Sequence, residues 1–270
     1  MHIRGNLRKM ESGYDKGDPS LPVKYSLPIG SDLLPLNDLT GTSIMIEWGD
    51  KINCIHCGRE TRQSFAQGYC YPCFISLPQT DACILRPEKC QAHLGISRDM
   101  EWSERNCLQN HYVYLALSPG LKVGVTRQSQ VPVRWIDQGA SAAIKLAVTP
   151  NRYIAGTIEV ELKNHLSDKT NWRHMLMDLE PREIDLLDEK MRIYSLLPEE
   201  MKKYICKDDK IFKFQYPVEE YPAKIKTLNL DKDKTIKGIL EGIKGQYLIL
   251  EGGNVLNVRK FGGYLVDFYY

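Results

Sequence analysis

The sequence predicts an α+β protein that combines a small β module from the two chain ends, a zinc-binding segment with four cysteine ligands and an α/β core. Three observations lead to this prediction. Strand-like runs occupy both ends of the chain, two CxxC pairs lie between residues 54 and 73, and strand and helix patterns alternate further along. We therefore expect four segments, at residues 1–50, 51–108, 109–205 and 206–270.

Length and composition are consistent with a folded core and exclude several classes of protein. The chain has 270 residues, of which 43% are hydrophobic and 26% charged, and its formal net charge is +2. These proportions are not those of a disordered polyelectrolyte, a collagen-like chain or a coiled coil. The low net charge also excludes nucleic-acid binding through bulk charge, so such binding would need a local basic patch.

The first and last segments favour β-structure. Residues 23–28 and 211–216 alternate between apolar and polar, and residues 43–48 form a run of strand-forming residues before a turn. Later strand-forming runs end at glycine-containing turns, and short strands at this spacing indicate a small barrel or sandwich. We expect the two ends of the chain to pair into one sheet module.

No membrane partner is expected, because no stretch approaches the roughly 18 apolar residues of a membrane span. The first residues also lack the apolar segment of a secretory signal. We therefore expect a cytoplasmic protein, in which the eight cysteines remain reduced. In such a compartment thiols bind metal more often than they form disulfides.

Four cysteines form the two CxxC pairs: Cys54, Cys57, Cys70 and Cys73. Two thiolates three positions apart on a tight turn can share one ion, and a second pair completes tetrahedral sulfur coordination. The spacing predicts a structural zinc ion, because four thiolates leave no open position for water or substrate. The alternative is a group of buried reduced cysteines or a redox pair.

A second cluster follows, with Cys83, Cys90, His93 and Cys107 as candidate ligands. The spacings from Cys90 to His93 and from Cys107 to His111 resemble those of metal ligands, but Cys83 and Cys90 do not form a standard knuckle. One interpretation is a second metal site. The other is small buried residues beneath the zinc segment, with the histidines at the surface.

The third segment alternates strands and helices. Residues 111–117 and 121–125 predict a hairpin around the turn at 118–120. Apolar residues then recur every four positions over residues 154–166, which predicts a helix over 150–166. A second helix is expected to begin at Pro181 and to end near Pro198.

The order of residues in this segment resembles the GIY-YIG endonuclease superfamily. Tyr112-Val113-Tyr114 corresponds to the GIY triplet and Lys122-Val123-Gly124 to the YIG triplet. Arg134 and Glu159 follow on expected helices. The resemblance covers about 65 residues, and it implies a GIY-YIG-like core.

The resemblance also implies roles for these residues. Arg134 corresponds to the arginine that contacts phosphate, and Glu159 to the carboxylate that holds a divalent ion. Tyr112, Tyr114 or Lys122 would be the partners of the attacking water. A single carboxylate suits magnesium or manganese, which keep most of their water ligands, and such a site suits phosphodiester hydrolysis.

Several alternatives remain open at these positions. Lys122 replaces the second tyrosine of the family, so it is either a base or a phosphate clamp, or activity is lost. Glu159 and Glu161 flank the apolar stripe of their helix equally, and only the family pattern favours Glu159. Arg134 can instead pair with a surface acid such as Asp137, and the tyrosines can belong to the core.

Further basic and aromatic residues are candidates for nucleic-acid contact. Arg127 follows the second strand, and Lys169 and Arg173 flank Trp172, which can stack on a base. The alternative interpretation of residues 168–174 is the capped start of a helix. The sequence does not discriminate between DNA and RNA, and it leaves the oligomeric state open.

Longer stretches look like a bacterial and archaeal family catalogued as a domain of unknown function. These are residues 122–127, 134–140, 168–172 and 242–249. This resemblance covers nearly the whole chain and brings no activity with it.

Three hypotheses for function follow. The first is a zinc-containing nucleic-acid-binding protein with a metal-dependent phosphodiesterase core. The second is a zinc-dependent RNA- or DNA-binding module without catalysis. The third is an enzyme that uses the second cysteine and histidine cluster on a small molecule.

Overall fold

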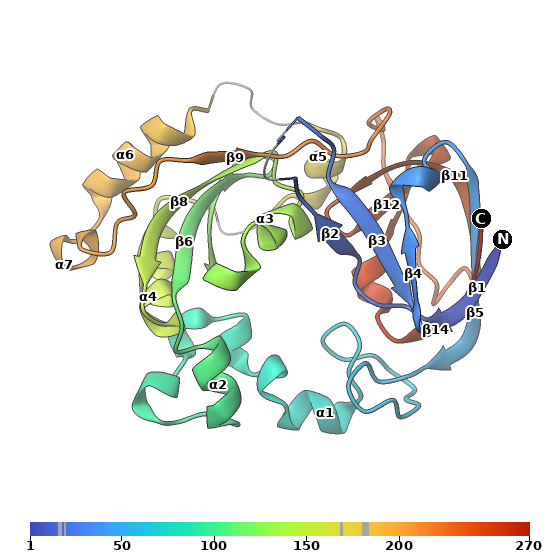
Figure 1. The fold of residues 1–270 in the computed structure, drawn as a ribbon, viewed down its shortest axis with the longest axis horizontal. Helices are drawn as coiled ribbons and strands as arrows, with labels where there is room; N and C mark the ends of the chain where they lie inside the picture. The colour runs from blue at the N-terminus through green and yellow to red at the C-terminus, as the bar shows by residue number, and fades with distance from the viewer. Residues whose placement is uncertain (16–17, 19, 168–169, 180–183) are drawn as a thin grey trace. The chain divides into compact units, whose positions relative to one another are not determined.

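The computed structural model describes residues 1–15, 18, 20–167, 170–179 and 184–270. Two compact units make up the chain (Figure 1). Unit 1 contains residues 1–75 and 215–270, and unit 2 contains residues 76–214. The cysteine-rich segment expected at 51–108 is therefore divided: the two CxxC pairs belong to unit 1, and Cys83, Cys90 and Cys107 belong to unit 2.

Unit 1 is mainly β-structure. Its strands and helices are β1 (His2–Asn6), β2 (Glu11–Gly13), β3 (Lys24–Ile29), β4 (Asp32–Pro35), η1 (Asn37–Leu39), β5 (Ser43–Ile52), α1 (Tyr71–Ser76, ending at the unit boundary), β10 (Lys226–Thr227), β11 (Thr235–Lys244), β12 (Tyr247–Leu250), η7 (Glu251–Gly253), β13 (Asn254–Asn257), η8 (Val258–Phe261) and β14 (Tyr264–Tyr269). The η elements are short 3₁₀ helices. One sheet has the order β1-β14-β5-β11-β12-β13-β10, and a second has the order β2-β3-β4.

The two ends of the chain pair within the larger sheet, as the sequence suggested. Strand β14 lies between β1 and β5 and is antiparallel to both, and Figure 1 shows the blue and red ends side by side. The alternation of β14 explains its place, because Tyr264, Val266 and Phe268 are buried while the residues between them are half-exposed. Buried Gln246 adds a second link, since its side chain bonds both the N–H and the carbonyl of Met10.

Unit 2 contains the mixed core. Its helices and strands are η2 (Pro78–Thr80), η3 (Ala82–Ile84), η4 (Pro87–Lys89), η5 (Ala92–Leu94), α2 (Met100–Asn106), β6 (His111–Leu117), β7 (Leu121–Arg127), η6 (Gln128–Gln130), α3 (Val133–Asp137), β8 (Ala142–Thr149), α4 (Arg152–Leu162), α5 (Trp172–Leu176), α6 (Leu186–Leu196), α7 (Glu199–Lys202) and β9 (Ile211–Lys213). Its sheet has the order β7-β6-β8-β9, with antiparallel neighbours throughout.

Helices cover both faces of this sheet. Val113, Leu115 and Val123 share a buried cluster with apolar residues of α4 and α6. On the opposite face, Trp135 of α3 packs edge-on against Tyr114 at 5.7 Å between ring centroids. Figure 1 accordingly shows α3 and α4 on opposite sides of β6. The alternation of β6 therefore separates an apolar face from a face that carries Tyr114.

The expected helices and strands occur with shifted ends. The β6–β7 hairpin is confirmed, and the helix expected over 150–166 is α4, which begins after the Asn151 cap and ends at Leu162. The helix expected from Pro181 begins only at Leu186, because the Asp185 side chain accepts hydrogen bonds from the N–H groups of Leu187 and Asp188. Pro181 itself lies outside the described residues.

Residues 206–214 belong to unit 2, although the sequence groups them with the C-terminal strands. Strand β9 pairs with β8, and its Phe212 packs against Trp135 at 5.0 Å. Across the described ranges, no helix is both long and apolar enough to cross a membrane.

Candidate functional site

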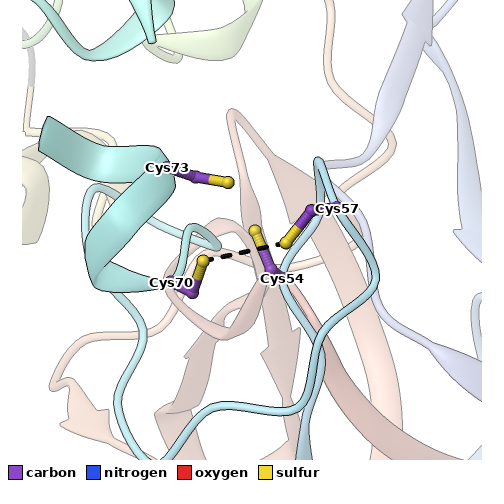
Figure 2. Close-up of side chains that lie close together, drawn as sticks. All are labelled: Cys54, Cys57, Cys70 and Cys73. Atoms are coloured by element: carbon purple, nitrogen blue, oxygen red, sulfur yellow. Dashed lines mark hydrogen bonds between the residues drawn. The ribbon is translucent and has the colours of Figure 1, made fainter. Parts of the chain in front are cut away.

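The two CxxC pairs lie on two turns of unit 1 that face each other. Cys54 follows strand β5, and its turn closes through the Gly58 N–H, which donates to the Cys54 carbonyl at 3.0 Å. Cys70 immediately precedes α1, and Cys73 lies within that helix. Figure 2 shows the four side chains pointing toward one another.

The four thiols are close enough to share one ion. Their sulfur atoms all lie within 4.8 Å of one another, and the Cys57 and Cys70 sulfurs are 3.8 Å apart (Figure 2). All eight cysteines of the chain are free thiols. The spacing of these sulfurs approaches the edge of a tetrahedron with metal–sulfur bonds of about 2.3 Å.

The protonation of these thiols is strongly perturbed. Burial raises the pKa of the Cys54 thiol, but hydrogen bonds from the backbone N–H groups of Cys57, Cys70 and His56 outweigh it and bring the pKa to about 6. Burial and hydrogen bonds that the Cys73 S–H donates to the neighbouring sulfurs raise the pKa of Cys73 to about 12. Zinc takes the place of thiol protons when it binds. The donor set is therefore compatible with a structural zinc ion.

A second group of thiols lies in unit 2. The sulfur atoms of Cys83, Cys90 and Cys107 lie within 4.8 Å of one another, and all three residues are buried. His93, the fourth ligand candidate from the sequence, is exposed and stacks on Tyr153 at 4.4 Å between ring centroids. This group is thus a set of three thiols in the part of the chain that the structure describes.

A polar cluster surrounds the Tyr114 hydroxyl on the α3 side of the sheet. Tyr114 donates to Gln138 Oε1 at 2.9 Å, and Lys122 Nζ donates to the same oxygen at 2.7 Å. Lys122 Nζ also lies 2.6 Å from Thr170 Oγ1. Tyr114 and Lys122 are 1% and 3% exposed, so the cluster is held inside the unit.

The charges of Arg134 and Glu159 both influence the pKa of the Tyr114 hydroxyl. Burial raises the pKa of Tyr114, the positive charge of Arg134 and its hydrogen bond lower it, and the negative charge of Glu159 raises it, with a net increase. Arg134 is half-buried, whereas Glu159 is 8% exposed and pairs with Lys163 at 3.5 Å. Because Glu161 is more exposed than Glu159, the structure distinguishes two residues that the sequence left equivalent.

The other residues singled out in the sequence make different contacts. Tyr112 is buried beside Lys145, whose Nζ lies 5.1 Å from its ring centroid. Arg127 donates to Asn106 Oδ1. Trp172 and Arg173 contact each other at the start of α5, where Asn171 caps the helix. Lys169 lies outside the described residues.

Three residues of these sites were not assigned roles from the sequence. Gln138 is four residues after Arg134, a spacing that places both side chains on one side of a helical turn. This spacing is the feature of the sequence that could have identified Gln138 as part of the site. Thr170 had no signal beyond a polar run, because its contact with Lys122 crosses 48 positions. Arg152 is buried and donates to the carbonyls of Cys83 and Asn106, which only the folded chain brings near it.

Of the comparisons with known proteins, the one with family models gives a match. Neither the curated proteins nor the solved structures include one that matches the chain. A family model described as "Protein of unknown function (DUF2797)" matches residues 41–266, which span most of both units. The chain belongs to this DUF2797 family.

Proposed function

We propose that this protein binds nucleic acid and hydrolyses phosphodiester bonds at the polar cluster of unit 2, while zinc at the four thiols of unit 1 has a structural role. One observation supports the proposal: Tyr114 and Lys122, from adjacent strands, share a bond to Gln138, and Arg134 and Glu159, from two helices, influence the pKa of Tyr114. These elements, β6, β7, α3 and α4, follow one another in the order that the GIY-YIG resemblance implies.

Each side chain has a role that its environment supports. Arg134 is half-buried and carries a planar guanidinium, which suits two phosphoryl oxygens. Tyr114 has a raised pKa, caused first by burial, so it stays protonated at neutral pH; its single O–H now donates to Gln138 and would have to leave that oxygen to donate to a reacting water or phosphate. Lys122 is buried and donates to the side-chain carbonyl oxygen of Gln138; we assign it as the phosphate clamp, with a general base as the alternative.

Glu159 is the residue of this cluster that would hold magnesium or manganese. A buried single carboxylate fits such an ion, which keeps its remaining ligands as water. The ion would supply neutralisation of the charge that develops on the phosphoryl oxygens. Binding would displace Lys163 from the carboxylate that it now pairs with at 3.5 Å.

A nuclease assay tests the proposal. Purified full-length protein is incubated with single- and double-stranded DNA and RNA in magnesium, manganese or EDTA. We expect metal-dependent cleavage that falls by about 100-fold or more in Arg134→Ala and Glu159→Gln. Glu161→Gln is the matched control, since it changes the same residue type on the same helix and should retain cleavage. Loss in all three variants, or cleavage in EDTA, would contradict the assignment.

A second candidate function is nucleic-acid binding without cleavage. It is favoured by the burial of Tyr114 and Lys122 and by their shared bond to Gln138, which leaves both side chains engaged within the protein. In that case no cleavage occurs, and binding weakens with salt and with Arg134→Ala. Absence of both cleavage and binding would leave the resemblance to GIY-YIG nucleases as one of fold alone.

A further inference from the structure

We propose that Cys83, Cys90 and Cys107 bind a second zinc ion, whose fourth coordination position opens into an adjoining cavity and takes a small thiol. This site is independent of the polar cluster to which the phosphodiesterase function is assigned. It also differs in kind from the four-thiol site of unit 1, which offers zinc a closed set of ligands.

The three thiols come from separate turns that the fold holds together. Cys83 lies in η3, and Cys90 and Cys107 directly follow η4 and α2. Their exposed fractions are 8%, 3% and 1%, and their sulfurs lie within 4.8 Å of one another. A single zinc ion with bonds of about 2.3 Å requires sulfurs roughly 3.8 Å apart, so small side-chain rotations suffice to bind it.

Hydrogen-bond donors already surround these sulfurs. The Ala92 N–H donates to the Cys90 sulfur, and the Ser103 hydroxyl donates to the Cys107 sulfur. Arg152 bonds the Cys83 carbonyl at 3.2 Å through a guanidinium that is also buried. Donors and a cation beside the sulfurs stabilise thiolates and are typical of the residues that support metal ligands. Three thiolates with zinc carry one net negative charge, which Arg152 partly offsets.

A cavity opens directly on the three sulfurs. Its volume is about 280 Å³, and its lining includes all three cysteines together with Trp102, Ser103 and Arg98. Drug-sized ligands occupy about 300–1,000 Å³, so this space suits a smaller molecule. Because the three cysteines line it, this cavity is where the proposed ligand would approach the metal.

Among the described residues, no fourth histidine, cysteine or carboxylate ligand atom lies within 4.8 Å of all three sulfurs. Asp81 lines the cavity, but its carboxylate accepts the Cys83 N–H at 3.0 Å and pairs with Arg98 at 3.1 Å. His93 stacks on Tyr153. His111 lies outside the three-thiol group, although its buried Nε2 has no hydrogen-bond partner, so it is the protein side chain that competes for this position. An open fourth position on zinc holds water until another ligand replaces it, and a thiolate is a ligand that zinc binds well, so we assign a small thiol as the ligand that replaces this water.

Zinc content tests the site itself. Full-length wild-type protein should contain two zinc ions per chain by mass spectrometry, Cys90→Ser and Cys107→Ser should contain one, and Cys206→Ser should contain two, because Cys206 belongs to neither group. One zinc in the wild-type protein that survives in Cys90→Ser would overturn the proposal. Circular dichroism of each variant checks that it is folded.

Cobalt substitution of the wild-type protein tests the open coordination position, so this test does not depend on whether a variant folds. Wild-type protein loaded with cobalt should show thiolate-to-cobalt absorption, and added 2-mercaptoethanol should shift the bands of one of its two sites. Absence of any shift would overturn the open position. His111→Gln should keep two zinc ions and the response to the thiol. Loss of zinc in that variant would assign the fourth coordination position to His111, and this result would also overturn the proposed open position.

Both readouts are separate from nuclease activity. A protein that cleaves nucleic acid but holds one zinc would contradict this inference alone. A protein that holds two zinc ions, responds to the thiol and does not cleave would contradict only the proposed phosphodiesterase.

Discussion

At the scale of single residues, Gly124 shows why the polar cluster has its present form. A Cβ at this position would lie 2.5 Å from the hydroxyl oxygen of Tyr114 and 2.6 Å from the ring carbon that carries it. The missing side chain therefore lets the Tyr114 ring cross strand β7 and place its hydroxyl beside Gln138 and Arg134. The glycine of the second triplet is needed for packing, whatever the chemistry of the site.

This close approach predicts that Gly124→Ala destabilises the protein by about 1–3 kcal/mol. Replacing glycine in a strand with alanine usually raises the free energy of unfolding, because alanine loses less conformational freedom on folding than glycine does. The sign of the change in this free energy therefore tests the packing argument. Urea unfolding measures it. Gly120→Ala is the control, since no atom lies within 4 Å of the Cβ it would add. Equal stability of both variants would contradict the packing argument.

Residue identity alone did not decide the role of Lys122. The sequence allowed a base, a phosphate clamp or an inactive site. Its Nζ donates to the amide oxygen of Gln138, a bond that an ammonium and a neutral amine both make. Because Gln138 follows α3 and Lys122 lies in β7, the surroundings of Lys122 are a property of the folded unit.

At the scale of elements, α4 links the polar cluster to the three-thiol group. It carries Glu159 on one turn and Arg152 on another, and Arg152 bonds the carbonyls of Cys83 and Asn106. Its Gly156 allows η4 to pack against the helix, because an added Cβ would lie 2.2 Å from the Glu88 backbone nitrogen. The segment with Cys83 and Cys90 is thereby fixed on α4.

We expect Gly156→Ala to lower the free energy of unfolding by at least about 1 kcal/mol. An ordinary glycine within a helix would give the opposite sign, since alanine is favoured there by about 1 kcal/mol. The clash is with backbone atoms of Pro87 and Glu88, which cannot rotate away. Thermal unfolding measures the change, and a stabilised variant would show that η4 does not pack closely on α4.

The element scale also shows where the patterns in the sequence are reliable. The apolar spacing of Ile158 and Leu162 predicted a buried helix face, and both are fully buried in α4. The start of α6 was misplaced, because a proline signal was preferred to the Asp185 side chain that caps the helix. Periodicity identifies a helix well, whereas competing caps decide where it begins.

At the scale of the whole molecule, the two units differ in how the chain builds them. Unit 2 is one continuous stretch, residues 76–214, whereas unit 1 needs residues 1–75 and 215–270. Strand β5 of the first stretch pairs on one side with β14 and on the other with β11, both from the second. A sheet whose central strand lacks both partners exposes its backbone groups and its apolar face.

This arrangement predicts different behaviour of two fragments. Residues 76–214 should fold alone, with dispersed amide resonances and far-ultraviolet circular dichroism of a mixed α and β protein. Residues 1–75 should remain unfolded, even with zinc, until residues 215–270 are added. A folded 1–75 fragment, or an unfolded 76–214 fragment, would contradict the division into these units.

The sequence by itself determined the local features of this protein. The CxxC spacing indicated four clustered thiols, the alternation of residues 111–117 and 121–125 indicated the β6–β7 hairpin, and apolar periodicity indicated α4. In each case residues within a few positions of one another carry the signal. Short-range spacing limits which atoms can meet, so these features need no knowledge of the rest of the chain.

Only the tertiary structure decided which distant residues meet. It paired β14 with β1 and β5, grouped Cys83, Cys90 and Cys107 without His93, and brought Gln138 and Thr170 to Lys122. It also buried Glu159 more deeply than Glu161. The physical reason is that contacts across tens of residues depend on how whole helices and strands pack together. The spacing of neighbouring residues does not determine that packing.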